Sequence, residues 1–293
     1  MAGIRIHVVD GTYELFRHFF GAPPATDKQG REIGAVRGVV GSILGMLEDG
    51  ATHLGVATDH VVESFRNDMY PGYKTGEGIE PVLMNQFHPL EDALRALGVR
   101  VWPMIDQEAD DAMAAAAARA SEDPAVERIF LCTPDKDLGQ CVRGDRVVQF
   151  DRRAGVIRNA DGVREKFGVD PESIPDYLGL VGDSADGFPG VPGWGAKSAG
   201  TVLGVYKTLE KIPQDRAWRM KVRGAARLTE SLTDHWNDAL LFRELARLRT
   251  DHPVFDTVED LRWRGPRKEF AVWAEQAGTP GLARRAAALA ETR

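Results

Sequence analysis

Acidic residues come directly after several short apolar segments of this chain. Asp10 and Asp59 each end such a segment, and a third segment leads into Asp135 and Asp137. If the segments are parallel strands, their carboxyl ends share one edge of a sheet, which is where open α/β sheets bind ligands. We therefore expect these carboxylates to converge on one site.

Two further acidic groups stand where the chain begins a helix or turns. Glu108, Asp110 and Asp111 open an alanine-rich segment, and at helical spacing Glu108 and Asp111 share a face. Asp183 and Asp186 lie three residues apart in a segment rich in glycine and proline. Both groups are candidates for the same site, and the helix N-terminus favours negative charge at the first.

Binding of divalent metal ions is the chemistry that fits nine converging carboxylates. Such a cluster repels itself at neutral pH unless protons or cations neutralise it. Because all the donors are carboxylate oxygens, Mg²⁺ or Mn²⁺ fits better than a softer metal. Taken singly, each group is an ordinary helix cap or turn former. The predicted ligands are Asp10, Asp59, Glu108, Asp110, Asp111, Asp135, Asp137, Asp183 and Asp186.

A segment rich in glycine and proline, residues 182–195, is expected to join two helices. Gly193 and Gly195 let backbone N–H groups approach a phosphate at the start of the second helix, and Lys197 adds positive charge. Contacts of this kind bind the DNA backbone without reading its sequence. The alternative for the segment is an ordinary loop between helices.

The elements that must position these residues alternate between short apolar runs and longer helical segments, a pattern typical of strand–helix units around a parallel sheet. Strand signals end near residue 168, and the remainder is expected to be mostly helical. The strand candidates are 4–9, 54–58, 99–103, 129–133 and 147–150, and the helix candidates are 33–48, 81–96 and 110–120.

Composition narrows the class of protein. The 293 residues, 43% of them hydrophobic, can bury a large core without disulfides, and the two cysteines and scattered histidines do not have zinc-ligand spacing. Without a signal peptide or a long apolar run, we expect a cytoplasmic protein with no membrane segment. The net charge of −7 argues against a nucleic-acid partner. However, Lys and Arg recur in 216–249 and 262–268, so one molecule can combine an acidic centre with basic flanks.

With both halves in view, the sequence resembles the 5′ nuclease family, which includes the 5′–3′ exonuclease domain of bacterial DNA polymerase I, phage 5′ exonucleases and flap endonucleases. The resemblance covers nearly the whole chain, and the order and spacing of its motifs are specific. The motifs are Val-Asp-Gly at 9–11, Phe-Arg at 65–66, Tyr-Lys at 73–74, Glu-Ala-Asp-Asp at 108–111, Asp-Lys-Asp at 135–137, Gly-Asp-Ser-Ala-Asp at 182–186 and Gly-Val-Pro-Gly-Trp-Gly-Ala-Lys at 190–197.

The resemblance implies a fold and an activity. The fold is a PIN-like α/β catalytic domain with a central, mostly parallel sheet over 1–168, followed by a helical region over 169–293. That region contains a helix–three-turn–helix DNA-binding module at about 176–203. The activity is structure-specific hydrolysis of DNA phosphodiesters in replication or repair, as a 5′–3′ exonuclease, a 5′-flap endonuclease or both, by a chain that acts alone as a monomer.

The resemblance also implies roles for single residues. One metal ion would lie near Asp10, Asp59, Glu108 and Asp110 and a second near Asp135, Asp137, Asp183 and Asp186, with Asp111 binding directly or through water. Lys74 and Arg17 would offset charge on the reacting phosphate, and K⁺ would bind at the module. Arg66, Tyr73, Gly193, Gly195 and Lys197 would contact DNA, with Tyr73 either stacking on a base or packing as a surface aromatic residue on the arch, the segment through which a 5′ end is thought to pass.

Three other functions agree with parts of the sequence. A phosphatase of the haloacid-dehalogenase type needs a second aspartate two residues after Asp10, where this chain has Thr12. A non-catalytic, structure-specific DNA-binding protein has no need of nine carboxylates, which weaken DNA binding unless metal neutralises them. A ribonuclease of the PIN group stays open, as does RNA in a hybrid duplex.

Overall fold

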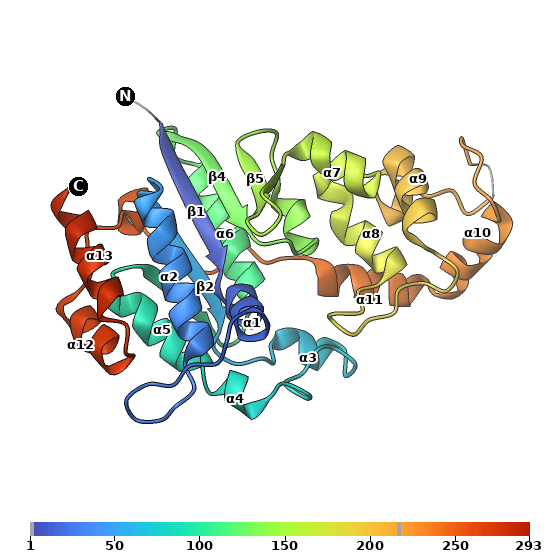
Figure 1. Cartoon of the computed structure of the whole chain (residues 1–293). Helices are drawn as coiled ribbons and strands as arrows, with labels where there is room; N and C mark the ends of the chain where they lie inside the picture. The colour runs from blue at the N-terminus through green and yellow to red at the C-terminus, as the bar shows by residue number, and fades with distance from the viewer. Residues whose placement is uncertain (1–2, 216–217) are drawn as a thin grey trace. The chain divides into compact units, whose positions relative to one another are not determined.

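The computed structural model describes residues 3–215 and 218–293. Arg216, where the basic stretch 216–249 begins, lies outside them. Two compact units form, each from separate stretches of chain (Figure 1). The first unit comprises Met1–Val62, Gly76–Thr133 and Thr250–Arg293, and the second comprises Glu63–Thr75 and Pro134–Arg249.

The first unit is built on a parallel sheet. Its strands lie in the order β3-β2-β1-β4, and each neighbouring pair is parallel. The strands are short continuous apolar runs, as expected where helices cover both faces of a sheet; Val8, Val9 and Val56, for example, are fully buried. The bounds are β1 (Ile4–Asp10), β2 (His53–Asp59), β3 (Arg100–Met104) and β4 (Val126–Cys132).

Helices connect these strands and cover the sheet. From β1 to β3 the chain moves outward in one direction, and from β3 it returns across the sheet to place β4 beside β1. Because crossovers between parallel strands are right-handed, the two directions put helices on opposite faces, as α2 and α6 lie in Figure 1. The order therefore reverses between β1 and β4, the position where open α/β sheets form ligand sites. The connecting helices are α1 (Gly11–Gly21), α2 (Gly34–Glu48), α5 (Phe87–Ala96) and α6 (Ala109–Ser121).

The helix expected over 81–96 is two helices in the structure, α4 (Pro81–Met84) and α5. Pro89 explains the break, because a proline inside one long helix would remove a hydrogen bond and clash with the carbonyl of Asn85. In α5 the same proline lies in the first turn, where its missing N–H is not needed. The first unit ends with η4 (Val258–Leu261), α12 (Lys268–Gln276) and α13 (Pro280–Glu291).

The second unit is mostly helical. Its strands β5 (Val147–Asp151) and β6 (Val156–Arg158) form an antiparallel hairpin, of which the sequence predicted only the first strand. After residue 168 the described residues form no further strand, as expected. The helical elements are α3 (Phe65–Met69), η1 (Asp137–Cys141), α7 (Ala160–Phe167), η2 (Pro171–Ser173), α8 (Ile174–Val181), α9 (Ala196–Tyr206), η3 (Leu209–Lys211), α10 (Ala225–Asp234) and α11 (Trp236–Ala246).

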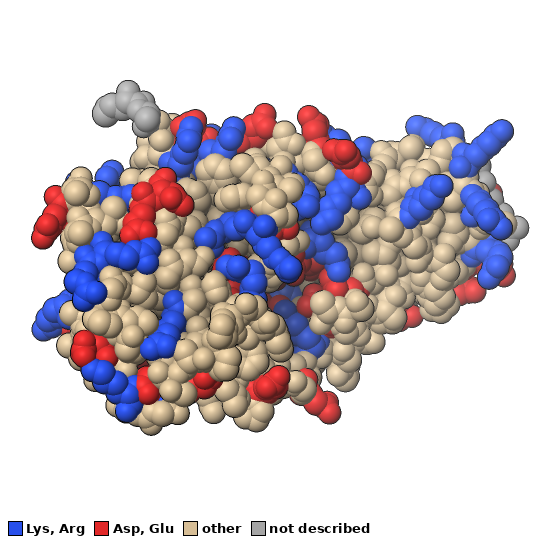
Figure 2. All heavy atoms as spheres, in the orientation of Figure 1, with Lys and Arg blue, Asp and Glu red and all other residues tan. Residues whose placement is uncertain are grey.

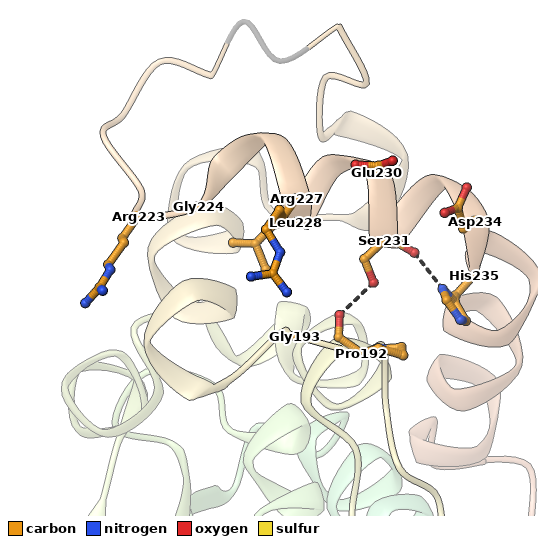
Figure 3. A pocket seen from close by; sticks show the side chains of 10 residues that line it. All are labelled: Pro192, Gly193, Arg223, Gly224, Arg227, Leu228, Glu230, Ser231, Asp234 and His235. Atoms are coloured by element: carbon orange, nitrogen blue, oxygen red, sulfur yellow. Dashed lines mark hydrogen bonds between the residues drawn. The ribbon is translucent and has the colours of Figure 1, made fainter.

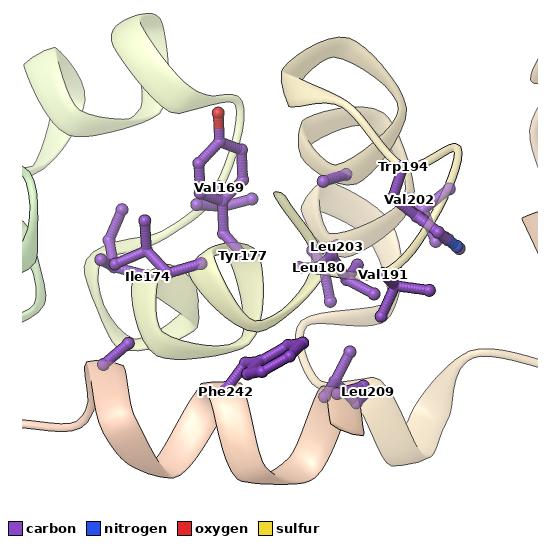
Figure 4. Packing of buried hydrophobic residues seen from close by; sticks show 14 of the residues in the cluster. Val169, Ile174, Tyr177, Leu180, Val191, Trp194, Val202, Leu203, Leu209 and Phe242 are labelled. Carbon is purple, nitrogen blue, oxygen red and sulfur yellow. The ribbon is translucent and has the colours of Figure 1, made fainter. Parts of the chain in front are cut away.

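A separate apolar core holds the second unit together. Leu180 of α8, Leu203 of α9 and Phe242 of α11 are buried in it, with Trp194 and Val191 from the turn between α8 and α9 (Figure 4). The glycine- and proline-rich segment is therefore anchored by its own apolar side chains. Among the described residues, no helix is long and apolar enough to cross a membrane.

Candidate functional site

Asp10 lies where the strand order of the first unit reverses. It ends β1 and caps α1, and its Oδ1 accepts a hydrogen bond of 2.8 Å from the Tyr13 backbone N–H. Its Oδ2 accepts one of 3.0 Å from the hydroxyl of Thr133, the residue after β4. The carboxylate is thus buried and oriented at the carboxyl ends of β1 and β4.

Asp59 and the acidic residues of α6 meet at the same edge of the sheet. The Oδ1 of Asp59, at the end of β2, accepts a hydrogen bond of 2.8 Å from the backbone N–H of Ala109. Glu108 N donates to Asp111 Oδ2 at 3.0 Å, and both residues are buried, Asp111 completely. Asp110 lies beside them and is partly exposed. The backbone N–H groups and dipole of α6 favour this gathering of negative charge.

Three carboxylates of the second unit form a tighter cluster. One oxygen each from Asp137, Asp183 and Asp186 lies within 4.8 Å of the others, the only group of acidic, His or Cys side chains in the described residues that meets this distance. Burial, with the charges of Asp135, Asp186 and Asp183, raises the pKa of Asp137 well above its usual range. Its Oδ1 is buried and has no hydrogen-bond partner among the described residues. A divalent cation would satisfy this oxygen and neutralise the cluster, so the donor set fits a metal.

Two lysines contact this acidic cluster. Lys136 Nζ lies 2.6 Å from Asp183 Oδ2, and Lys74 Nζ lies 3.4 Å from Asp186 Oδ1. Burial alone would lower the pKa of Lys136, but the contact with Asp183 and the charge of Asp137 raise it. Lys136 is a functional candidate that the sequence analysis missed, although it stands between the two predicted ligands of the Asp-Lys-Asp motif.

Asp135 is not one of the three clustered carboxylates. Its Oδ1 accepts a hydrogen bond of 2.9 Å from the backbone N–H of Asp137, at the start of η1. Its backbone carbonyl accepts a hydrogen bond from the side-chain amide of Gln149. Asp135 therefore orients Asp137, and its charge contributes to the raised pKa of that residue.

Glycines shape the loop that carries Asp183 and Asp186. Gly182 and Gly190 approach so closely that a Cβ on Gly190 would lie 2.3 Å from Gly182 N. Gly187 has φ +85°, and a Cβ there would lie 2.2 Å from the carbonyl oxygen of Gly72. Only glycine fits these positions without a shift of the backbone. The loop is closed by Asp183 N, which donates to the Phe188 carbonyl at 2.8 Å.

Two residues predicted to contact DNA are buried in the structure. Arg66 is 1% exposed, and its guanidinium donates to the backbone carbonyls of Leu245 at 2.8 Å and Arg247 at 3.0 Å. Tyr73 is 3% exposed and belongs to the apolar core of the second unit. Both side chains are thus buried in this conformation, and Tyr73 is not the surface aromatic residue of the alternative. Their contacts with DNA stay a prediction.

Arg17, predicted to offset phosphate charge, is held by a neighbour on α1. Its guanidinium donates to the carboxylate of Glu14, which is buried, and lies 3.0 Å from His18 Nε2. The guanidinium of Arg17 is therefore fixed in position but partly occupied by this ion pair. Its catalytic role stays a prediction.

The turn before α9 and the start of that helix present the three residues predicted to bind the DNA backbone. Gly193, Gly195 and Lys197 are all exposed. Gly193 has φ +82°, and no atom lies within 4 Å of a Cβ built there, so its backbone is open to a close approach. Beneath them the buried Trp194 donates from Nε1 to the Leu228 carbonyl at 3.1 Å and fixes the turn.

Comparison with known proteins agrees with this geometry. The family model described as the N-terminal resolvase-like domain of 5′–3′ exonucleases matches residues 5–168, and the model described as their C-terminal SAM fold matches residues 169–269. The chain is 34% identical to DNA polymerase I of Pseudomonas aeruginosa over 277 residues, which are 90% of this chain and 29% of the polymerase. It is 29% identical to a 5′–3′ exonuclease of Aquifex aeolicus over 89% of this chain and 87% of that protein.

Solved structures share the fold at low sequence identity. One is a phage T5 5′-exonuclease with bound zinc ions, with a TM-score of 0.64 and 20% identity over 98% of both chains. Another is the catalytic core of Rad2 in complex with a DNA substrate, with a TM-score of 0.64 and 15% identity over 98% of this chain and 92% of that one. The expected PIN-like α/β fold with a helical region is therefore confirmed. The two family models together cover most of the sequence, and the chain belongs to the 5′–3′ exonuclease family.

Proposed function

We propose that this chain is a divalent-metal-dependent 5′ nuclease that hydrolyses DNA phosphodiesters in replication or repair, as a 5′–3′ exonuclease, a 5′-flap endonuclease or both. The observation that carries the proposal is the close group of Asp137, Asp183 and Asp186, with its buried oxygen that lacks a hydrogen bond. The chain spans less than a third of the DNA polymerase I that it matches, so the activity of this region by itself is what requires testing.

The proposed metal ligands form one group in each unit. Mg²⁺ or Mn²⁺ suits both groups because carboxylate oxygens are the only protein donors. When bound, such ions lower the pKa of a coordinated water and stabilise the oxygens of a phosphate during in-line displacement. The ligands in the second unit are Asp137, Asp183 and Asp186, with Asp135 as an orienting residue or a fourth ligand. The ligands in the first unit are Asp10, Asp59, Glu108 and Asp110, with Asp111 binding directly or through water.

Lysine side chains complete the chemistry proposed for the second unit. The Lys74 ammonium contacts the Asp186 carboxylate, and the Lys74 backbone N–H donates to the Asp186 backbone carbonyl at 2.9 Å. A phosphate that approaches this aspartate would therefore meet the Lys74 ammonium, which offsets its charge. Arg17 is the corresponding candidate in the first unit.

The proposed DNA interface is the module formed by α8, the following turns and α9. Gly193, Gly195 and Lys197 hold the sugar–phosphate backbone of a duplex, with K⁺ at the turns. The substrate is DNA with a 5′ end or flap, RNA in a hybrid is a second substrate, and the enzyme acts as a cytoplasmic monomer. The proposed catalytic domain is 1–168 and the proposed helical region is 169–293, with the module at about 176–203.

Cleavage of end-labelled DNA tests this function. A 5′-flap duplex and a blunt duplex are each incubated with Mg²⁺, with Mn²⁺ and with EDTA. Metal-dependent products that carry a 5′ phosphate support the nuclease, and their lengths separate flap incision from stepwise trimming. Binding of both substrates without any cleavage would instead support the non-catalytic DNA-binding protein.

A double variant tests the assignment of the second group. Asp135→Ala/Asp137→Ala removes one proposed ligand and the residue that orients it. We expect cleavage to be lost and DNA binding to be largely kept. If the variant cleaves at the wild-type rate, the metal assignment in the second unit is wrong.

A further inference from the structure

A cavity of about 600 Å³ lies between the turn that precedes α9 and the helix α10 (Figure 3). Pro192 and Gly193 line it from the turn. From the other side it is lined by the turn before α10, by α10 itself and by the residue that follows it, and Arg227 and Ser231 lie one helical turn apart on α10. The lining residues on this side include Arg223, Arg227, Ser231 and His235.

The two arginines of this cavity have no ion-pair or hydrogen-bond partner among the described residues. Both are exposed, and neither side chain makes an ion pair or hydrogen bond with any residue in the described ranges. Other arginines of the second unit are used differently: Arg243, for example, pairs with Asp176 and Glu210. A guanidinium without a partner offers all five donors to a ligand, in a planar fork that matches a phosphate.

Hydrogen bonds fix the walls of the cavity. Ser231 Oγ donates to the Pro192 carbonyl at 2.6 Å, which joins α10 to the turn. Trp194, directly after Gly193, donates from its indole to the Leu228 carbonyl at 3.1 Å and packs on Trp218. The turn and α10 are thus joined at two places, which fixes the backbone of Gly193 relative to that of Arg227.

Two acidic residues also line the cavity but face differently. In Figure 3 the carboxylates of Glu230 and Asp234 lie on the side of α10 away from Pro192 and Gly193, whereas the guanidinium of Arg227 points toward the turn. The space beside the turn is therefore basic. Figure 2 likewise shows Lys and Arg side chains gathered over the α9 and α10 end of the second unit.

We infer that this cavity is a second phosphate-binding site for the DNA backbone, in which Arg223 and Arg227 hold phosphates next to the one bound at Gly193. The inference rests on the proposed function, because the ligand is the duplex held by the α8–α9 module. The cavity is larger than a single phosphate and admits flanking sugars, which suits a continuous strand. Like the contacts at Gly193, these contacts are independent of base sequence.

Salt-dependent binding of a labelled duplex in EDTA tests the site without hydrolysis. The variant is Arg223→Ala/Arg227→Ala, and the matched control is Arg153→Ala/Lys211→Ala, which removes two exposed charges that do not line the cavity. We expect the slope of log K against log salt to fall by about two in the variant and the affinity at low salt by about tenfold. A variant slope equal to that of the wild type, or an equal loss in the control, would overturn the inference.

Neutral phosphates locate the contact on the DNA. Methylphosphonates introduced one position at a time should weaken binding by the wild type at the contacted positions and have no further effect on the variant. Arg223→Lys/Arg227→Lys should keep most of the slope because it keeps the charge. Equal sensitivity of wild type and variant at every position would contradict the site, and thermal unfolding of each variant verifies its fold.

Turnover separates this inference from the proposed function. If both hold, Arg223→Ala/Arg227→Ala raises KM for the flap duplex and leaves kcat unchanged. If the variant shows the predicted fall in slope but the wild type does not cleave DNA, the nuclease is refuted and the phosphate site is retained. Normal cleavage with no slope difference would refute the phosphate site alone.

Discussion

Asp137 shows how one residue can be unfavourable for folding and favourable for binding. Its carboxylate is buried beside Asp183 and Asp186, and one oxygen has no hydrogen bond among the described residues. The predicted ligands follow apolar runs, open a helix or lie in the glycine- and proline-rich segment, and their binding of metal stays a prediction. The sequence did not predict that Asp135 accepts a hydrogen bond from the Asp137 backbone while Asp137 lies beside Asp183, since that depends on the local turn geometry.

The raised pKa of Asp137 predicts how stability depends on pH. Because its pKa in the folded state lies above the usual value of 3.8, its contribution to the free energy of unfolding is full below that value and is lost as pH rises through the folded-state pKa. Asp137→Asn should remove this loss, so that without metal the variant is more stable than the wild type at neutral pH. Urea unfolding in EDTA across the pH range measures this. A variant with the wild-type pH profile would show that Asp137 is not under this strain.

Lys136 is predicted to compete with a metal ion for Asp183. Its ammonium lies 2.6 Å from the carboxylate and neutralises part of the cluster in the metal-free protein. We expect Lys136→Met to bind Mn²⁺ more tightly by titration calorimetry, because no internal cation has to be displaced. Lys207→Met, which removes a lysine paired with Asp170 in the same unit, is the control and should not change the affinity. Unchanged or weaker Mn²⁺ binding by Lys136→Met would refute this competition.

At the scale of elements, the strands of the first unit were predicted well and the helices less so. Strands β1 to β4 were found because buried parallel strands are continuous apolar runs, and β5 of the second unit was found from a similar short apolar run. Helix α1 was missed because it begins at Gly11 and is rich in Phe, so its propensity is low. Its cap is Asp10, a predicted metal ligand, and one side chain therefore serves both the helix and the site. Strand β6 has only three residues, too few for a pattern.

The loop that carries Asp183 and Asp186 depends on Gly187. Gly187→Ala should destabilise the protein by about 1–3 kcal/mol, because the residue is held in a left-handed conformation and its new Cβ meets the Gly72 carbonyl. Gly193→Ala is the matched control, since Gly193 has a similar φ but no atom within 4 Å of the added Cβ. We expect a loss of only about 1 kcal/mol there. Urea unfolding compares the two, and equal losses would mean that the contact with Gly72 is unimportant.

Charge is the feature that matters across the whole molecule. A chain with a net charge of −7 is a poor general binder of DNA, yet it exposes Arg223 and Arg227, which pair with none of the described residues, and Lys197 of α9. The net charge follows from the composition. Tertiary packing determines which arginines form ion pairs within the protein, and the sequence does not show this. Figure 2 shows both signs of charge spread over this face of the protein. Binding should therefore be sensitive to salt.

The most direct test of the metal-dependent nuclease is Mn²⁺-dependent cleavage of an end-labelled 5′-flap duplex by the wild type and by Asp183→Asn/Asp186→Asn, with Mn²⁺ binding measured in parallel. The variant keeps the size of both side chains and removes two of the three clustered charges. We predict that the variant no longer binds Mn²⁺ in the second unit. Its cleavage rate should fall by about two to three orders of magnitude, the loss typical of removing one charge-stabilising group. Wild-type rates from the variant, or cleavage by the wild type in EDTA, would contradict the account.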